Sequence, residues 1–364
     1  MSGGSLSDIL DSTESGGTVV VPPGTYEEML VIRKPVRLVA EVVGRTVIRS
    51  PGGMGCLSVL ADAHVEGFVF QADDRMSTAT VNVEAHCSIL SCEINRGSVG
   101  LQVNGAAGWA DVEYTFVLGA RVGILVTDAA HCRLQEVDVK PAGAHTVVVQ
   151  KGSRMGAIEC MMVAPPRGGA IVIGRSRFDA SRCNFTTDRV LAEQDTLRAS
   201  LLVTSGSHSR LRDCFVDDNM ASGIRFAGST GRLLRTSASG NWDYGIEVGN
   251  GSAVAIARGE FSRNGRAGVV ALDGASVAAH SITSTGNKHA AIAAINASRV
   301  RLKDSHELSG NLFGLFLESA ASAKLIRCDL RGNLREPLVT EADCTVEAVA
   351  SPIHGRKTAT LQSN

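Results

Sequence analysis

The sequence predicts an all-β protein: a single-stranded, right-handed parallel β-helix of about 12 to 13 coils, with a short helix capping its N-terminal end. Three observations predict this solenoid. A hydrophobic residue returns about every 23 positions, a second short apolar segment follows it in most repeats, and an asparagine recurs in register in six successive repeats. A fixed period in this range indicates stacked units, none of which can bury its apolar face alone. The recurring hydrophobic residues are Leu57, Val81, Leu101, Ile124, Val147, Ile171, Leu201, Ile224, Ile246, Val269, Ile292, Leu315 and Leu338.

Each repeat contains two or three short strands and no helix. Most of the recurring residues open an apolar, variable, apolar alternation, as in Ile246, Glu247 and Val248, and this period of two is typical of a strand. A second strand follows in the next part of the repeat, as at residues 90–94 and 211–215. Leucine-rich repeats would show a leucine consensus and a helical half, and helical repeats run longer, so both are excluded.

The asparagine register predicts a ladder of stacked side-chain amides. Coils of a parallel solenoid lie about 4.8 Å apart, so an amide can bond to the same side chain one coil away. Asparagine also tolerates the left-handed backbone of a turn. The six residues are Asn219, Asn241, Asn264, Asn287, Asn311 and Asn333.

The N-terminal residues predict a cap. In residues 5–12, Leu6, Ile9 and Leu10 share one helical face and a serine is available as N-cap. Such a helix would cover the apolar core and strand edges of the first coil. We therefore expect one domain over residues 1–364, with the cap and first coil at 1–30, coils at 31–345, a loop insertion at 186–198 and a C-terminal tail or cap at 346–364.

The segment after the cap resembles a known superfamily. Residues 16–28 read GGTVVVPPGTYEE and residues 30–38 read LVIRKPVRL. This pattern is similar to the first coil of the pectin-lyase-like β-helix superfamily, especially the NosD-type and F-box-type repeat proteins. The resemblance implies the fold but leaves the function open, because the superfamily includes lyases, hydrolases, epimerases and non-catalytic scaffolds.

Composition narrows the partners. The net charge is −1 with both signs evenly mixed, so no basic stripe points to nucleic acid. The sequence has no leader pattern and no apolar stretch of membrane-spanning length, which predicts no membrane partner and a cytoplasmic location. Among nine cysteines, five share one inward position of the second strand, which favours buried free thiols over disulfides. These are Cys92, Cys160, Cys183, Cys214 and Cys328.

One irregular step indicates a candidate catalytic region. Ile171 and Leu201 are separated by 30 residues instead of about 23, so residues 186–198 could bulge out and wall a cleft. The resemblance implies that lyases and epimerases of this fold use an arginine or lysine base beside a carboxylate neutraliser, often Ca²⁺, whereas the hydrolases use paired aspartates. The segments typical of those enzymes are absent, and solvated turn acids are the alternative interpretation. The candidate catalytic residues are Arg182, Asp188, His208, Arg212, Asp213 and Asp217.

A second constellation is a candidate binding surface. Alignment of the repeats places Glu136 beside Glu159 in one column, and Glu113 and Asp138, with Glu93, in the neighbouring one. Stacked carboxylates repel each other, so they could recruit Ca²⁺ or a cationic partner. No residue set has the spacing of a resident metal site, and no cofactor is implied beyond this Ca²⁺. Aromatic residues make up only 4% of the chain, and Trp242 and Tyr244 are the obvious platforms for a sugar ring.

Two functions remain open at this stage. The first is a binding or scaffold module that presents a flat stacked-sheet surface to a protein or glycan partner. The second is a lyase, epimerase or isomerase that acts on an anionic, uronate-like substrate near residues 186–198. The regular coils and the missing catalytic segments favour the first.

Overall fold

The computed structural model describes residues 5–73, 78–165, 168–187 and 199–352. The chain divides into two compact units, Met1–Asp179 (unit 1) and Ala180–Asn364 (unit 2). The single domain expected from the sequence stays a prediction. Asp188, nearly all of the expected insertion at 186–198, and the tail beyond residue 352 lie outside the described residues.

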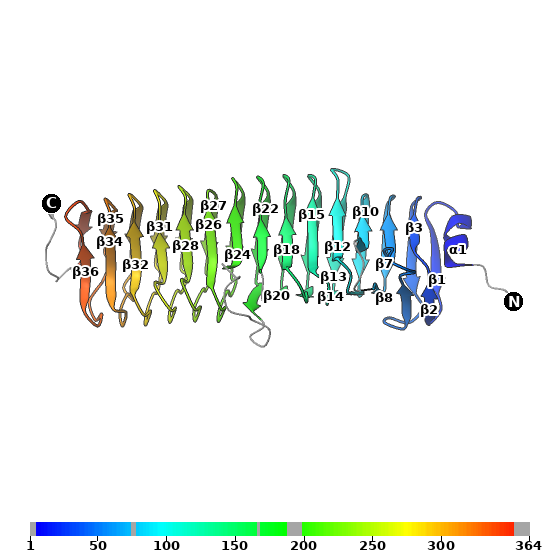
Figure 1. The fold of residues 1–364 in the computed structure, drawn as a ribbon, viewed down its shortest axis with the longest axis horizontal. Helices are drawn as coiled ribbons and strands as arrows, with labels where there is room; N and C mark the ends of the chain where they lie inside the picture. Colours follow the sequence, from blue (N-terminus) through cyan, green and yellow to red (C-terminus); the bar gives the residue numbers. More distant parts are fainter. Residues whose placement is uncertain (1–4, 74–77, 166–167, 188–198, 353–364) are drawn as a thin grey trace. The chain divides into compact units, whose positions relative to one another are not determined.

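Within each unit the chain winds through three parallel sheets, here named A, B and C (Figure 1). Sheet B has a strand in each turn of unit 1, but is reduced to single bridges over most of unit 2. Strand β22 (Arg177–Ser181) of sheet A lies where the division between the units falls.

In unit 1, sheet A contains β1 (Gly17–Val21), β4 (Val36–Ala40), β7 (Ala63–Glu66), β10 (His86–Leu90), β13 (Trp109–Glu113), β16 (His131–Gln135) and β19 (Arg154–Ile158). Sheet B contains β2 (Gly24–Glu27), β5 (Thr46–Arg49), β8 (Phe68–Gln71), β11 (Glu93–Asn95), β14 (Phe116–Leu118), β17 (Asp138–Lys140) and β20 (Met161–Ala164). Sheet C contains β3 (Leu30–Ile32), β6 (Leu57–Val59), β9 (Ala79–Val83), β12 (Val99–Asn104), β15 (Val122–Thr127), β18 (His145–Val149) and β21 (Ala170–Val172).

In unit 2, sheet A contains β25 (His208–Arg212), β27 (Thr230–Leu234), β29 (Ala253–Ala257), β31 (Ser276–His280), β33 (Arg299–Lys303), β35 (Ser322–Ile326) and β37 (Thr345–Val349). Sheet C contains β24 (Ala199–Thr204), β26 (Ser222–Ala227), β28 (Ile246–Gly249), β30 (Val269–Ala271), β32 (Ala290–Ile295), β34 (Phe313–Glu318) and β36 (Glu336–Thr340). Sheet B begins with β23 (Asn184–Thr187) and continues as single bridges at Phe215, Ser237, Glu260, Thr283 and Glu307.

The recurring hydrophobic residues lie in register on sheet C, as predicted. In unit 2, for example, Ile246 pairs with Val269, which pairs with Ile292. The described strands make about 14 turns over the two units, because the turn that contains Leu30 precedes the first predicted repeat at Leu57. One assignment is wrong by a residue: Ile171 pairs with Val148 and faces outward, so Ala170 takes the inward position.

The segment predicted as one second strand is two strands separated by a bend. At residues 90–94, β10 ends at Leu90, Ser91 adopts a left-handed conformation (φ 51°), and β11 begins at Glu93. Cys92 is buried in this bend, and burial raises the pKa of its thiol to about 12. The five aligned cysteines each follow a left-handed residue in this way and are free and buried, as predicted. The other four cysteines of the chain are also free and buried.

The asparagine ladder is confirmed and lies wholly within unit 2. Each side-chain Nδ2 donates to the Oδ1 of the next asparagine at 2.8 to 3.1 Å, from Asn219 through to Asn333. The Thr187 hydroxyl donates to the first Oδ1 at 2.8 Å. The left-handed residue of this turn is the one that precedes the asparagine, such as Asp218 or Gly240, and not the asparagine itself.

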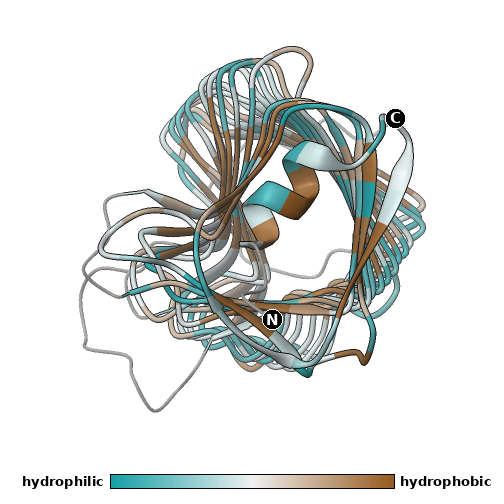
Figure 2. Ribbon diagram, turned by 90° about the vertical axis from the view of Figure 1, so that its right-hand side faces the viewer, coloured by the Kyte–Doolittle hydropathy of each residue, from teal (hydrophilic) through white to brown (hydrophobic). Residues whose placement is uncertain are grey.

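Helix α1 (Leu6–Ser12) forms the predicted cap of unit 1. The Ser5 side chain accepts a hydrogen bond from the Asp8 backbone N–H, which completes a capping box. Leu6 and Leu10 are buried, whereas Ile9, predicted on the same face, is 45% exposed. Figure 2 shows the helix in front of the first turns, whose inner surface is apolar.

Candidate functional site

Three of the predicted catalytic residues meet at one bend of unit 2. The Arg182 backbone N–H donates to the Arg212 carbonyl at 2.9 Å, and Asp213 follows directly in a left-handed conformation. Arg235 was not among the predicted site residues. It donates two hydrogen bonds to the Asp213 carboxylate, from Nε to Oδ1 at 2.5 Å and from Nη2 to Oδ2 at 2.8 Å. The hydrogen bond from Arg235, helped by the charges of Arg235, Arg212 and Arg182, lowers the pKa of Asp213. A carboxylate held in this way is a weak base.

The other predicted catalytic residues are held by separate partners. Asp217 Oδ1 accepts hydrogen bonds from the Ser237 hydroxyl and the Ser239 backbone N–H, both at 2.7 Å. His208 Nδ1 bonds to the Thr230 hydroxyl at 2.8 Å. Asp188 lies outside the described residues. The turn serines therefore fix Asp217, as expected for a structural turn acid.

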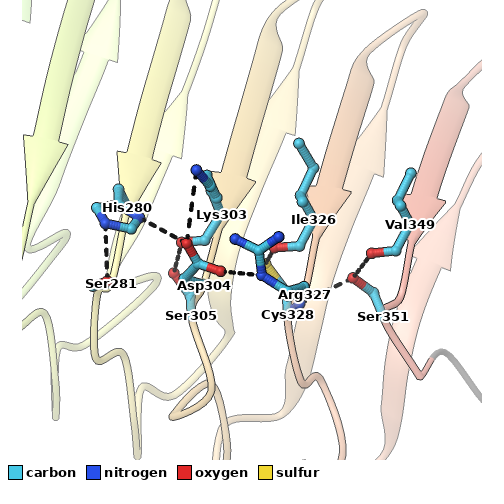
Figure 3. A network of polar contacts seen from close by, with 10 residues as sticks. All are labelled: His280, Ser281, Lys303, Asp304, Ser305, Ile326, Arg327, Cys328, Val349 and Ser351. Carbon is cyan, nitrogen blue, oxygen red and sulfur yellow. Dashed lines mark hydrogen bonds and ion pairs between the residues drawn. The ribbon is translucent and has the colours of Figure 1, made fainter.

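The arrangement at Asp213 recurs elsewhere in unit 2. Asp304 follows β33 in the same left-handed bend, and its Oδ1 lies 2.5 Å from Arg327 Nε of the next turn. His280 and Lys303 approach its other oxygen at 3.4 and 3.9 Å (Figure 3). The same carboxylate-guanidinium pair therefore occurs at two equivalent bends, after β25 and after β33. At both bends it links one turn of the solenoid to the next, which is a structural role. This repetition argues against a catalytic role for Asp213.

The predicted acidic column lies in unit 1, with a tyrosine in it. Tyr114, Glu136 and Glu159 occupy the left-handed position after β13, β16 and β19. The charge of Glu136, with smaller effects from burial, Glu113 and Glu159, raises the pKa of the Tyr114 phenol. The carboxylates thus gather at one place.

The neighbouring acidic column was predicted correctly for Glu93 and Asp138, which share a column of sheet B, and wrongly for Glu113. Glu113 ends β13 and pairs with Gln135 in sheet A. Asp138 begins β17 and pairs with Phe116 in sheet B, and Phe116 separates it from Glu93. The left-handed bend divides the residues that the sequence alignment had placed in one column.

Large apolar side chains are exposed among these carboxylates. Tyr114, Phe116, Ile158 and Met161 are 41% to 48% exposed. Met161 pairs with Asp138, which in turn pairs with Phe116, so the apolar and acidic side chains alternate. We call this surface the acidic-aromatic corner; it comprises Glu113, Tyr114, Phe116, Glu136, Asp138, Ile158, Glu159 and Met161.

The predicted aromatic platform lies in a turn of unit 2. Trp242 is 60% exposed, and Tyr244 of the same turn is half-buried. Arg266, one turn later, donates from Nη1 to the Tyr244 hydroxyl at 2.9 Å, and its Nε lies 3.0 Å from Asp243 Oδ1. The guanidinium carbon is 5.4 Å from the centre of the Tyr244 ring. Asp243, which lies between Trp242 and Tyr244 in the sequence, is therefore held in a carboxylate-guanidinium pair.

A second ion pair lies beside this turn, on the outer face of sheet C. Glu247 of β28 points outward, yet its side chain is only 10% exposed. Arg225 Nε of β26 lies 3.3 Å from Glu247 Oε1, and the Ser222 hydroxyl donates to Oε2 at 3.4 Å. Burial raises the pKa of Glu247, and Asp243 adds to this effect while Arg225 opposes it. Glu247 therefore holds a proton more readily than an ordinary carboxyl group.

The following turns add a histidine and an apolar floor. The His289 ring centroid lies 5.4 Å from that of Phe313 and 4.9 Å from that of Phe316. Burial, together with the charge of Arg266, lowers the pKa of His289, which favours the neutral imidazole. Val270 and Ala293 lie on the outer face of sheet C but are only 0% and 2% exposed, because Tyr244 and these phenylalanines pack over them.

These side chains make one site, here named the Tyr244 site: Arg225, Asp243, Tyr244, Glu247, Arg266 and His289. It offers hydrogen-bond donors and acceptors in fixed positions beside aromatic rings and an apolar floor. The sequence analysis proposed Tyr244 but missed Arg266 and His289, although each follows Asp243 by one or two 23-residue periods. Within the described parts of the chain, no group of three or more His, Cys, Asp or Glu residues could hold a metal ion, and Ca²⁺ stays a prediction.

Comparison with known proteins identifies the fold of the chain. The family model described as right-handed beta helix region matches residues 199–349. The catalytic unit of a thermostable alpha-1,3-glucanase from Streptomyces thermodiastaticus superposes with a TM-score of 0.51 at 13% identity, covering 87% of this chain and 65% of that chain. The gp42 tailspike of Acinetobacter phage vb_AbaP_AS12 superposes with a TM-score of 0.50 at 9% identity, covering 94% of this chain and 59% of that chain.

The protein is thus a right-handed parallel β-helix. The resemblance of its first coil to the pectin-lyase-like superfamily agrees with this fold. Identities this low establish the fold alone, and this chain spans only about two thirds or less of both structures. A comparison with curated protein sequences gives no match. Among the described residues, no helix is long and apolar enough to cross a membrane.

Proposed function

We propose that this chain is a carbohydrate-binding module, and that unit 2 holds a glycan segment at the Tyr244 site. The observation that carries the proposal is the Arg266 guanidinium, which lies 2.9 Å from the Tyr244 hydroxyl, 3.0 Å from Asp243 and 5.4 Å from the centre of the Tyr244 ring. This develops the binding function that the sequence analysis favoured and selects the glycan from its two partners.

The chemistry of the site suits a sugar. A sugar ring has an apolar face that packs on an aromatic ring, and a rim of hydroxyls that need donors and acceptors at fixed angles. Tyr244 supplies the ring, and the exposed Trp242 belongs to the same turn. Asp243, Arg266 and Glu247 supply planar polar groups that their own ion pairs hold in place, so little rotamer entropy is lost on binding.

The comparisons lend support of a general kind. One of the two structures is, by its name, a glucanase that acts on alpha-1,3-glucan. The fold therefore occurs in at least one protein with a carbohydrate function.

The enzymatic alternative at residues 182–213 is less favoured. A lyase or epimerase there would need Asp213 or a nearby arginine free to take a proton, and Arg235 occupies both oxygens of Asp213. If the protein does turn over a glycan, the raised pKa of Glu247 makes that carboxyl the better acid.

The test measures glycan binding by variants of the Tyr244 site. On a panel of neutral glycans that includes alpha-1,3-glucan, Tyr244→Ala and Arg266→Ala should each weaken binding by roughly tenfold or more, since each removes a ring contact or a charge-assisted hydrogen bond. Tyr244→Phe should weaken it less, because the ring remains.

Arg232→Ala is the control, because it removes an exposed arginine from sheet A of the same unit. Equal binding by all variants, or no binding of any glycan by the parent protein, would refute the proposal. Release of a cleaved or unsaturated product in the same assay would show an enzyme in place of a pure binding module.

A second function is favoured by the acidic-aromatic corner of unit 1. Exposed apolar side chains among carboxylates suit a basic, amphipathic protein segment, which would bury Phe116 and Met161 and pair with Glu136. This is the protein partner of the sequence analysis, placed on a different unit from the glycan.

We expect a peptide of alternating lysine and leucine to bind unit 1 more tightly at low salt. The double variant Glu136→Lys, Glu159→Lys should weaken this binding about tenfold or more, because it reverses two charges at the corner. The control is Glu14→Lys, Glu41→Lys, which makes the same charge change at exposed positions of unit 1. Equal losses in both double variants would show non-specific attraction only.

A further inference from the structure

The outer face of sheet A in unit 2 carries a concavity of about 810 Å³ that the Tyr244 site does not use. It extends over strands β31, β33, β35 and β37, and its charged and hydroxyl side chains include Ser276, Arg299, Arg301, Ser322, Lys324 and Glu347. Most of the remaining lining is alanine and valine. The floor is therefore smooth, and the polar groups that stand on it determine what it could bind.

Arg299 stands between two serines. Strand pairing places Ser276 of β31 on one side of it and Ser322 of β35 on the other. Neighbouring strands lie about 4.8 Å apart, so both hydroxyls are within reach of an oxyanion bound by the guanidinium. Among the hydrogen bonds of the described residues, none involves either hydroxyl.

Arg301 points to the same face two residues later, about 7 Å along the strand. Its neighbours are Ala278 on β31 and Lys324 on β35, and Lys324 is occupied by Glu347 at 2.5 Å. Among the described residues, neither Arg299 nor Arg301 forms an ion pair. Several other exposed arginines of unit 2, such as Arg235 and Arg327, hold a carboxylate of their own.

Among the described residues, Arg299 and Arg301 have no carboxylate partner, and two serine hydroxyls flank Arg299. This arrangement indicates an anionic ligand with regularly spaced charges. A protein partner would need apolar or aromatic anchors, and the concavity has no aromatic side chain among its lining residues. Single-stranded nucleic acid would need rings on which its bases could stack. A polymer that has both hydroxyls and repeated oxyanions satisfies serine and arginine together.

We propose that this concavity is a second binding site, specific for the carboxylate or sulfate groups of an acidic polysaccharide. Arg299 binds one oxyanion together with the serine hydroxyls, and Arg301 binds a second one further along the polymer. The site lies on sheet A, whereas the Tyr244 site lies on sheet C and in its adjoining turns, so the two can be tested separately.

The experiment measures the affinity of the intact protein for hyaluronate, dextran sulfate and neutral dextran. Hyaluronate carries carboxylates and dextran sulfate carries sulfates, so the two probes distinguish the sources of the oxyanion. The double variant Arg299→Ala, Arg301→Ala should lose roughly tenfold or more of the affinity for at least one acidic polymer, and neither protein should bind dextran at this site. Adding salt should weaken the parent protein far more than the variant.

The control is Arg37→Ala, Arg45→Ala, which removes two exposed arginines from unit 1 and should bind as the parent does. Tyr244→Ala should also keep the affinity for the acidic polymer, so failure of the Tyr244 site would not affect this test. Equal affinity of the parent and the Arg299, Arg301 variant would overturn the proposal. Tighter binding of polyglutamate or single-stranded DNA than of either acidic polysaccharide would overturn the choice of ligand.

Discussion

Replacing Asn287 with alanine should lower the free energy of unfolding of unit 2 by about 3 kcal/mol, because several buried groups lose their partners at once. The side-chain Nδ2 of Asn287 donates to the Phe261 carbonyl at 3.0 Å, to the Ser284 hydroxyl at 3.0 Å and to Asn311 Oδ1 at 2.8 Å. Its Oδ1 accepts from the backbone N–H and the side chain of Asn264 at 2.9 and 3.0 Å. Buried polar groups without partners pay their full desolvation cost.

The measurement is urea unfolding followed by circular dichroism, with Lys288→Ala as control. Lys288 is the next residue and is exposed, so its substitution should leave the midpoint nearly unchanged. Asn333→Ala should cost less than Asn287→Ala, because Asn333 ends the described ladder and donates only to the Leu308 and Leu330 carbonyls. A variant of Asn287 that unfolds at the parent's urea concentration would show that water replaces the ladder without cost.

The 23-residue period predicted the fold well at positions where a side chain packs on, or bonds to, the equivalent side chain one turn away. Buried anchors such as Ile246 and Val269 pair as the spacing requires, since a one-residue slip would turn an apolar side chain outward. Asn264 and Asn287 also keep their spacing, because the side-chain hydrogen bond between them forms only in this register. The prediction failed at Ile171 because the larger apolar residue was chosen, although a step of 23 residues from Val147 leads to the buried Ala170.

The bends after the sheet A strands were hidden for a different reason. A left-handed residue is usually recognised as glycine, but here Ser91, Tyr114, Glu136 and Arg182 all adopt positive φ. The stacked bends impose this conformation through backbone bonds to the next turn, such as Glu136 N–H to the Ile158 carbonyl at 3.0 Å. Because no residue type marks the bend, the sequence presented two strands as one.

The candidate sites could be predicted only in part, because their residues come together from successive turns. Asp213 was a reasonable catalytic candidate from its neighbours in the sequence, but its partner Arg235 lies one turn further on and decides its chemistry. Tyr244 was recognised as an aromatic platform for a similar reason, while Arg266 and His289 carry no motif. Charged side chains can be placed in columns from a period, but which carboxylate each arginine chooses depends on side-chain rotamers that spacing does not reveal.

The cap should matter as much to unit 1 as the ladder matters to unit 2. Helix α1 is held by Glu28, whose carboxylate accepts hydrogen bonds from the Leu6 and Ser7 backbone N–H groups at 2.9 Å each. Negative charge at a helix N-terminus is favourable, so Glu28 orients the helix over the first turns. Leu6 and Leu10 can then cover the end of the apolar core.

Leu10→Asp should therefore destabilise unit 1 by about 3 to 5 kcal/mol, because it removes a side chain that is only 4% exposed and places a carboxylate in its position. Displacing the helix would also uncover the edge strand β3, which the helix contacts and whose backbone groups could then pair with another chain. We expect a lower melting temperature and concentration-dependent light scattering. Ile9→Asp is the matched control, since Ile9 is 45% exposed on the same helix and should behave as the parent does. If both variants melted with the parent and stayed monodisperse, helix α1 would be dispensable and the strand edge would be protected by something other than the cap.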